Sequence, residues 1–479
     1  MKGRVIIYSI TGCPFCMRAK DKMQKLGIEY MDINLDTHPE RRAEAKKRTG
    51  KNTVPQIFFN NIHVGGFDDF NKLSEAELQE LIKEVEENPA PADAPQPPTP
   101  KSDAANGGEA IDFTCELDEY AQLVKDFKES GLIKDRRKGL IHCYKNSFIG
   151  KEAVDWLVTS KKIEREKAVE MCRELVERNF GHGVEKGKHT EFKDDSSIYR
   201  LLEDDESTAL NSGMSSVCEP RPAPEIAEEL RRLILKLYGQ FLSKDGKGVD
   251  YNSMGDSAEF KAYIKHTAEL QRVKLDGLSR EETLAFFINI YNALVIHATV
   301  LRGPPANLWE RYKFFNTVSY IIGGHTFGLN EIENGILRSN RKAIGAVTKP
   351  FSKSDPRLRV ALPAPEPKIH FALVCGAKSC PPIKTYTSAG IDEELSLAAD
   401  SFLEGEDGCV LNMPKREIRL SKIFQWYRVD FGSNNEELVQ FVLAHMGQGQ
   451  KKDQLQELLI SGNFKVSFMK YNWDLNSKH

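Results

Sequence analysis

The sequence lacks the features that mark membrane, secreted and nucleic-acid-binding proteins. Its apolar runs fall far short of the roughly 20 residues that cross a bilayer, so we expect no membrane-spanning helix. Met1–Arg4 leads directly into a strand pattern without the apolar core of a signal peptide, and Lys2 stands where N-myristoylation needs glycine. A net charge of −3 over 479 residues argues against general binding of nucleic acids or membranes, although one face can carry a local charge.

Repeats and a disulfide framework are missing as well. The 9 cysteines have no regular spacing, which favours a reducing, intracellular compartment and predicts a cytoplasmic protein. No solenoid or propeller period recurs. The chain is nevertheless too long for one core, and a hydrophobic content of 40% lets each of several domains bury its own. We therefore expect a multidomain protein of mixed α/β and α+β character.

Two cysteines one helical turn apart form the strongest local signal. Cys13 and Cys16 follow the apolar run Val5–Tyr8, and this order predicts a strand, a tight turn and a helix. A cysteine at a helix N-terminus meets unpaired amides and the positive end of the helix dipole, which favour its thiolate. The second cysteine can then resolve a mixed disulfide on the first. A zinc site is the alternative, but His38 and His63 do not supply the second ligand pair that it requires.

The segments that follow continue an alternation of strands and helices. Ile28–Leu35 alternates like a strand, and a charged helix then ends at Gly50. Thr53–Phe59 is another strand, led by Pro55, at which a cis peptide bond costs least. Ser74–Glu77 has the pattern of a capping box and predicts the start of the last helix in this region.

Three motifs in register make residues 1–87 resemble the glutaredoxin family: Cys13–Cys16, Thr53–Pro55 and Gly65–Asp69. The resemblance implies a thioredoxin-like fold and an enzyme that exchanges thiols and disulfides with protein disulfides or glutathionylated proteins. It implies that Cys13 and Cys16 are catalytic. It also implies that glutathione, as co-substrate, lies against Thr53, Val54, Pro55, Gly66, Phe67 and Asp68.

One position departs from the family pattern. Many glutaredoxins carry a lysine shortly before the first cysteine, where it pairs with a glutathione carboxylate, and Ile10 offers no charge there. Arg18, Lys47 and Lys51 are the candidate substitutes. The fold and the thiol chemistry do not depend on this position, whereas glutathione affinity does.

Beyond this region the composition changes twice. Residues 88–111 are rich in proline, alanine and glycine, which predicts a disordered or extended tether that lets the first domain move. Residues 112–203 read as a compact domain with two short strands around a basic turn, Lys134–Lys138, and a longer helix over residues 165–177. Phe192–Asp194 and Ser197–Leu202 predict a closing strand pair.

The run Ser147–Leu157 makes this second domain resemble the DEP domain, a winged-helix-like module of signalling proteins. The resemblance implies recruitment to a membrane surface or a receptor-associated partner rather than catalysis. The basic turn would contribute about 1 kcal/mol per charge near anionic lipid, and an ordinary solvated turn is the alternative. Glutamates along the long helix would repel phosphates, so we expect no nucleic-acid partner.

A second linker covers residues 204–224, and residues 225–475 are expected to form a larger mixed α/β domain. Phe286–His297 is apolar almost all round, which predicts a buried helix in which Asn289, Asn292 and His297 need hydrogen-bond partners. Ile369–Val374 is expected to be a strand.

Three runs make this third domain resemble the domain of unknown function 547 family: Asn289–Ala293, Gly323–Phe327 and Cys375–Pro382. That name implies no chemistry. The residues permit a cysteine hydrolase or transferase site, with Cys375 or Cys380 as nucleophile and His325 or His370 as base. A zinc site, a structural or redox-labile thiol pair and ordinary buried packing are the alternatives.

Together these observations predict a glutathione-dependent oxidoreductase without a metal, tethered to a DEP-like module and to a domain of open role. The rival hypothesis is a redox-sensing signalling adaptor with little turnover.

Overall fold

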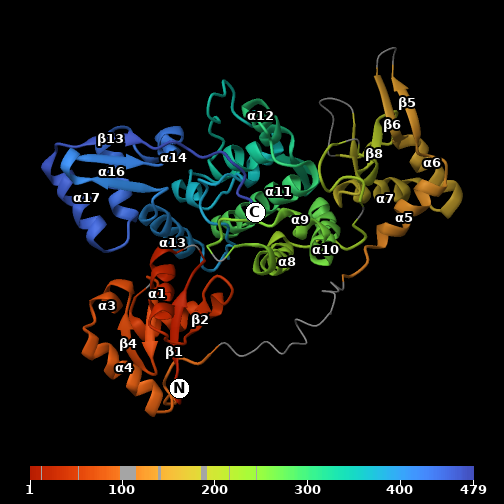
Figure 1. The fold of residues 1–479 in the computed structure, drawn as a ribbon. Coiled ribbons are helices and arrows are strands. Elements are labelled where there is room, and N and C mark those ends of the chain that lie inside the picture. Colours follow the sequence, from red (N-terminus) through yellow and green to blue (C-terminus); the bar gives the residue numbers. More distant parts are fainter. Residues whose placement is uncertain are drawn as a thin grey trace.

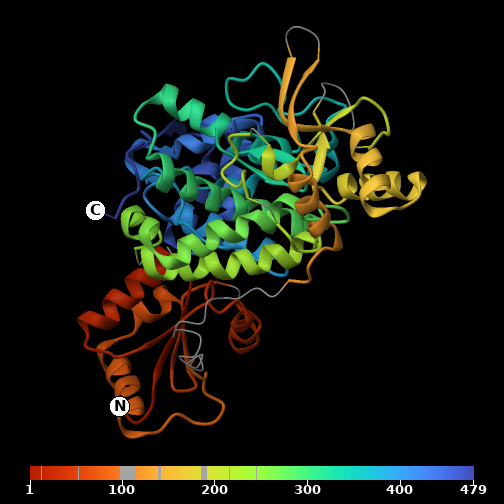
Figure 2. The ribbon, with the colours of Figure 1, turned by 90° about the vertical axis from the view of Figure 1, so that its right-hand side faces the viewer.

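The structure, a computed structural model of the chain, describes residues 1–11, 13–51, 53–97, 115–138, 142–184, 191–205, 207–214, 216–243 and 245–478. Three bodies follow one another along the sequence (Figures 1 and 2). The N-terminal and middle bodies lie apart from each other, and each lies against the larger C-terminal body.

The N-terminal domain is a four-stranded sheet with helices on its faces. Its strands are β1 (Val5–Ser9), β2 (Met31–Asn34), β3 (Gln56–Phe59) and β4 (Ile62–Gly65), and its helices are α1 (Pro14–Lys25), α2 (Arg42–Thr49), α3 (Phe67–Lys72) and α4 (Glu75–Glu87). The strand order is β2-β1-β3-β4, with β1 parallel to β2 and antiparallel to β3. Every side chain of β1 is buried, because both faces of this central strand are covered. This is the expected thioredoxin-like fold.

The first residues after α4 do not form a free tether. Arg4 donates through Nε to the carbonyl of Pro95 at 2.9 Å, and Arg41 donates to that of Gln96 at 2.8 Å. Ala94 is fully buried. The prediction of a tether from residue 88 is therefore wrong for residues 88–97, because arginines of the domain bind their carbonyls. The rest of that linker lies outside the described residues.

The middle domain packs three helices against an antiparallel sheet of order β5-β6-β8-β7. Its elements are α5 (Glu119–Glu129), β5 (Lys134–Lys138), β6 (His142–Ile149), α6 (Gly150–Lys161), α7 (Arg165–Glu177), β7 (Gly181–Gly183) and β8 (Ile198–Leu201). The basic segment is thus a strand rather than a turn. The predicted pairing of Phe192–Asp194 is also wrong, because β8 takes β6 and β7 as its neighbours instead.

The segment between the middle and C-terminal domains is also packed. Asn211 is buried and donates to the carbonyls of Thr267 and Ile321, both at 2.9 Å. Cys218 forms a disulfide with Cys115, 103 residues earlier in the chain. The irregular cysteine spacing gave no sign of this bond, which depends on the pairing of two distant segments.

The C-terminal domain is mostly helical, with a hairpin and a small mixed sheet. Its helices are α8 (Ala223–Phe241), α9 (Tyr251–Asp256), α10 (Ala258–His266), α11 (Arg280–Arg302), α12 (Leu308–Thr317), α13 (Ile391–Glu404), α14 (Lys422–Trp426), α15 (Arg428–Phe431), α16 (Asn435–His445) and α17 (Gln450–Ser461). Its strands are β9 (Ser319–Ile322), β10 (His325–Gly328), β11 (Cys409–Asn412), β12 (Glu417–Leu420) and β13 (Lys465–Phe468).

Helix α11 is the centre of this domain. It is long and apolar enough to cross a membrane by length and composition, but 89% of its most apolar window is buried inside the protein, as in the core helix of a folded domain. Polar side chains on it find the expected partners in part. Asn289 bonds the backbone of Tyr386, and His297 bonds the hydroxyl of Tyr320 through Nδ1, while its buried Nε2 has no hydrogen-bond partner among the described residues.

Asn292 on the same helix explains why one predicted strand is absent. Its side chain accepts from the amide of Val374 and donates to the carbonyl of Ala372, both at 2.9 Å. Without Asn292, the amide of Val374 and the carbonyl of Ala372 would need hydrogen-bond partners on a neighbouring strand. Pro367–Phe371 forms a 3₁₀-helix instead, with Pro367 in its first turn. The strand prediction for Ile369–Val374 is therefore wrong.

Candidate functional site

Cys13 is the N-cap of α1, as the motif predicts. Its sulfur accepts from the amide of Cys16 at 3.2 Å and lies 3.8 Å from the carbonyl oxygen of Val54. Complete burial and the neighbouring Cys13 sulfur raise the pKa of Cys16 well above its usual value, so Cys16 stays a thiol at neutral pH. One sulfur thus has a thiolate-favouring helix terminus, and the other keeps its proton.

The motif residues named for glutathione gather around Cys13. The Val54–Pro55 peptide bond is cis, as expected, and Phe67 lies beside Phe15 with ring centroids 6.3 Å apart. The amide of Gly66 is already occupied by Asp69, which accepts from it at 2.9 Å. Asp68 remains exposed beside it. This groove would therefore offer Asp68 and free backbone groups to the γ-glutamyl end of glutathione, without the Gly66 amide.

Two of the candidate cations, Arg18 and Lys51, make local contacts, and the third, Lys47, is exposed on α2. Arg18 lies over the ring of Phe15, 5.4 Å from its centroid, and Lys51 is 3.6 Å from a carboxylate oxygen of Asp69. Both side chains reach the neighbourhood of the motifs, and Arg18 stands one turn from Cys13 on α1.

Helix α13 (Ile391–Glu404) of the C-terminal domain lies next to α1 of the N-terminal domain (Figure 1). Leu397 of α13 packs against the cluster that holds Cys13 and Val54, and Cys13 is only 3% exposed. Lys46 and Arg42 of α2 lie 3.0 and 3.7 Å from Glu393 and Glu394. The cavity left beside Thr53, Val54 and Leu397 measures about 20 Å³, room for little more than one water molecule. Glutathione does not fit in that cavity, whereas a more open cavity of about 550 Å³ lies beside it and is lined by Thr53, Leu397 and His445.

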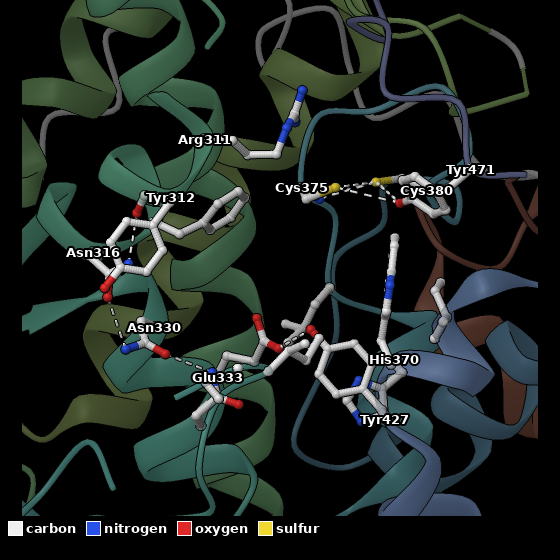
Figure 3. A pocket seen from close by; sticks show the side chains of 18 of the residues that line it. Arg311, Tyr312, Asn316, Asn330, Glu333, His370, Cys375, Cys380, Tyr427 and Tyr471 are labelled. Carbon is white, nitrogen blue, oxygen red and sulfur yellow. Dashed lines mark hydrogen bonds between the residues drawn. The ribbon is translucent and has the colours of Figure 1, made fainter. Parts of the chain in front are cut away.

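A separate cavity of about 570 Å³ lies within the C-terminal domain. Cys375, Cys380 and His370 line it, whereas His325 lies elsewhere on β10, near Arg357 and Arg359. The two sulfur atoms are 3.0 Å apart (Figure 3). Among the residues that the structure describes, neither thiol is hydrogen-bonded to a histidine. The predicted cysteine–histidine pair is therefore not assembled.

His370 belongs to a buried ion network instead. Its Nε2 lies 2.8 Å from Asp430, its ring stacks on Tyr427 at 3.9 Å between centroids, and Arg338 donates to the same carboxylate at 2.6 Å. Burial lowers the pKa of His370, and hydrogen bonds from His370 and then Arg338 lower the pKa of Asp430, which fits a neutral imidazole that donates to a carboxylate. This network holds His370 in the wall of the cavity.

Sequence reasoning missed several residues of this cavity. Tyr471 contacts both thiols and lies 91 residues after Cys380, too far for any local pattern to reveal. Glu333 accepts from Tyr291 and Tyr427 and lies on a π-helix, Glu331–Leu337. A π-helix is rare and often marks a functional site. Its π-type hydrogen bonding leaves no signature in sequence periodicity.

Comparisons with known proteins agree with the three-domain order. Residues 5–64 match the family described as Glutaredoxin, residues 132–201 the Domain found in Dishevelled, Egl-10, and Pleckstrin (DEP), and residues 275–403 the Protein of unknown function, DUF547.

Several curated relatives are glutaredoxins about as long as the N-terminal domain. A glutaredoxin of Pseudomonas aeruginosa is 44% identical over 72 residues, which are 15% of this chain and 86% of the relative. Glutaredoxin 1 of Rickettsia typhi is 42% identical, covering 18% and 84%, and glutaredoxin 3 of Escherichia coli 39%, covering 17% and 99%. The solved glutaredoxin of Brucella melitensis is 42% identical over 18% of this chain and 89% of its own, with a TM-score of 0.16. Through its N-terminal domain, this chain belongs to the glutaredoxin family.

Proposed function

We propose that the protein is a glutathione-dependent thiol–disulfide oxidoreductase whose reaction takes place at Cys13. The observation that carries the proposal is the placement of Cys13 as the N-cap of α1, with its sulfur bonded by the Cys16 amide and beside cis-Pro55. Relatives named glutaredoxin, about 40% identical over this domain, support it.

The reaction follows from the two thiols. The Cys13 thiolate attacks the glutathione sulfur of a glutathionylated protein, so that a Cys13–glutathione disulfide forms and the protein thiolate leaves. A second glutathione attacks this intermediate and departs as glutathione disulfide, restoring Cys13. With a protein disulfide, the protonated thiol of Cys16 resolves the intermediate once it loses its proton.

Replacement of each cysteine in the full chain tests this mechanism. In a glutathione-coupled assay with a glutathionylated peptide, Cys13→Ser is expected to abolish turnover, because no other sulfur caps α1. Cys16→Ser should retain most of it, because external glutathione resolves the intermediate. Reduction of a protein disulfide should need both cysteines. Equal turnover by the wild type and Cys13→Ser would contradict the proposal.

In this proposal, the middle domain determines where in the cell the protein acts. Exposed charges on β5, among them Lys134 and Arg137, would meet an anionic membrane surface or an acidic region of a receptor-associated partner. Binding of the full chain to vesicles with and without phosphatidylserine separates these partners. The protein would act in the cytoplasm, at the surface that this domain selects.

A redox-sensing adaptor with little turnover is the second candidate function, and the burial of Cys13 favours it. A thiol that is 3% exposed under α13 meets a large substrate only after the domains separate. In an adaptor, the contact between the N-terminal and C-terminal domains would form or break as the glutathione redox state changes. Its turnover would stay low even when that contact is broken.

A further inference from the structure

The cavity of the C-terminal domain has the dimensions and walls of a small-molecule site. Its volume of about 570 Å³ lies within the usual range for ligand pockets. Trp426, Tyr471 and Trp473 form one aromatic wall, with ring centroids 4.5 to 5.2 Å apart. Tyr312 of α12 lies on the opposite side of the cavity, facing the thiols (Figure 3), and its side chain is 63% exposed. Flat, apolar groups fit such walls.

Cys375 and Cys380 stand in this wall as an asymmetric pair. The Cys380 sulfur accepts from the amide of Cys375 at 3.2 Å and lies 3.2 Å from the hydroxyl of Tyr471. The Cys375 thiol lies 3.0 Å away and can donate to it. The chain just before Cys375 is held by Asn292 of the buried helix α11, which bonds the backbone of Ala372 and Val374.

The hydrogen-bond donors around the two sulfurs give them different pKa values. Hydrogen bonds from Cys375 and Tyr471 outweigh burial and lower the pKa of Cys380 to about 7, whereas the pKa of Cys375 is raised well above its usual value by the same pairing. Among the other titratable groups near them, Tyr251, Tyr291 and Tyr427 have pKa values that burial raises, and Glu333, His370 and Arg311 line the same cavity. At neutral pH, Cys380 is therefore the sulfur that ionises more readily, and Cys375 is the thiol that keeps its proton. Cys380 is 3% exposed, so a small substrate would reach it through the cavity that both sulfurs line.

Arg311 adds a charge to the cavity. It lies over the ring of Trp473 at 4.4 Å, donates to the carbonyl of that residue at 3.2 Å, and keeps a buried Nε without a hydrogen-bond partner. An unpartnered guanidinium nitrogen in an aromatic pocket favours an aromatic ligand that bears a carboxylate.

We propose that Cys375 and Cys380 form a second dithiol–disulfide centre, which reduces small disulfides whose aromatic, carboxylate-bearing groups fit this cavity. The Cys380 thiolate attacks one sulfur of the substrate, and the other sulfur leaves as a thiolate. Cys375 then attacks Cys380, which releases the second thiolate and the Cys375 proton and leaves a Cys375–Cys380 disulfide. Two glutathione molecules reduce this bond and leave as glutathione disulfide.

The geometry favours exchange over hydrolysis. A cysteine hydrolase needs a histidine in hydrogen-bond reach of its sulfur, and the imidazole of His370 is committed to Asp430 and stacked on Tyr427. The group in contact with Cys380 is instead a second thiol, which is what a resolving step requires.

The test counts thiolates released from 5,5′-dithiobis(2-nitrobenzoate), an aromatic disulfide with two carboxylates. The full chain carries Cys13→Ser, Cys16→Ser and Cys143→Ser, which remove the N-terminal centre and the exposed thiol. Buried Cys172 and Cys409 have pKa values raised to about 12 and about 11, and Cys115 and Cys218 are bonded to each other, so none of these competes.

We expect about two nitrobenzoate thiolates per chain, no retained aromatic group in the intact mass, and a peptide that joins Cys375 to Cys380. Cys375→Ser should release one thiolate and keep the aromatic group, and Cys380→Ser should react at least tenfold more slowly. Arg311→Met should slow the reaction with this disulfide but not with the uncharged 2-hydroxyethyl disulfide.

The proposal would be overturned if the chain that lacks only Cys13, Cys16 and Cys143 released a single thiolate and kept the aromatic group, because that result shows a lone reactive thiol. So would unchanged release after either cysteine is replaced. Circular dichroism of each variant establishes that it is folded. Since Cys13 and Cys16 are absent throughout, these outcomes are independent of the function proposed for the N-terminal domain.

Discussion

Individual buried side chains set the pH response of this protein, and His297 is the clearest case. It is fully buried in α11, between Phe260, Tyr263 and Tyr320, and burial lowers its pKa to about 4. An unfolded chain has an imidazole pKa of about 6.5. Between these values only the unfolded chain binds the proton, so stability is present above pH 6.5 and declines as the pH falls toward 4.

We predict that the C-terminal domain loses about 2 kcal/mol more stability between pH 7 and pH 5 than a His297→Gln variant does. Urea unfolding at both pH values, followed by tryptophan fluorescence, measures the difference. Gln cannot titrate, yet it can still bond the Tyr320 hydroxyl. Parallel pH profiles of the two proteins would refute the assignment. The sequence identified His297 as a buried residue that needs a partner, but Tyr320 emerges only from the fold.

At the scale of elements, one buried ion pair joins the middle domain to the C-terminal domain. Asp118 caps α5 and pairs with Arg272, and the side chains are 0% and 3% exposed. Arg272 also donates to the carbonyl of Cys218 at 2.7 Å and lies over the ring of Phe180. Both charges are removed from water, so burying either one without the other would strongly destabilise the folded state.

Arg272→Met is expected to destabilise the joined domains by about 3 kcal/mol, because it removes the buried partner of the Asp118 carboxylate and leaves it the partly exposed Arg178 at 3.2 Å. Adding Asp118→Asn should recover part of that loss, since the amide can still cap α5. Arg232→Met, which removes an arginine 66% exposed in its pair with Glu228, should change stability by about 0.5 kcal/mol or less. Chemical denaturation and limited proteolysis report the effect. Equal effects of the two arginine replacements would contradict the role of Arg272.

Elements that depend on local pattern were predictable, and those that depend on distant partners were not. The capping box at Ser74 and the helix opening at Cys13 follow from neighbouring residues, and both are confirmed. Ile369–Val374 looks like a strand locally, but Asn292 from another helix satisfies its backbone. The Cys115–Cys218 disulfide and the contact of Tyr471 with Cys380 likewise join segments that no window of sequence contains.

For the whole molecule, the main consequence of the fold is that the C-terminal domain covers the thiol of the N-terminal domain. Each domain has its own core, and the contact between them includes Leu397, the exposed pair Lys46–Glu393 and the largely buried pairs Arg42–Glu394 and Asp36–Lys384. The exposed pair Lys46–Glu393 contributes little, commonly less than about 1 kcal/mol. For the buried pairs, the cost of desolvating the charges offsets much of their attraction. With one leucine as its apolar part, we expect this contact to open during turnover.

Leu397→Glu on the full chain tests this arrangement. Leu397 packs on the Cys13 cluster but belongs to neither core of its own domain, so the substitution should break the contact without unfolding α13. We expect alkylation of Cys13 by iodoacetamide and turnover of a glutathionylated peptide to rise together, roughly tenfold for a loss of about 1.4 kcal/mol of closing energy. Ile460→Glu, the same change at a side chain that is 78% exposed on α17, should leave both rates at the wild-type value. If Leu397→Glu left the alkylation rate unchanged, Cys13 would already be accessible in the wild type, and the C-terminal domain would not restrain its chemistry.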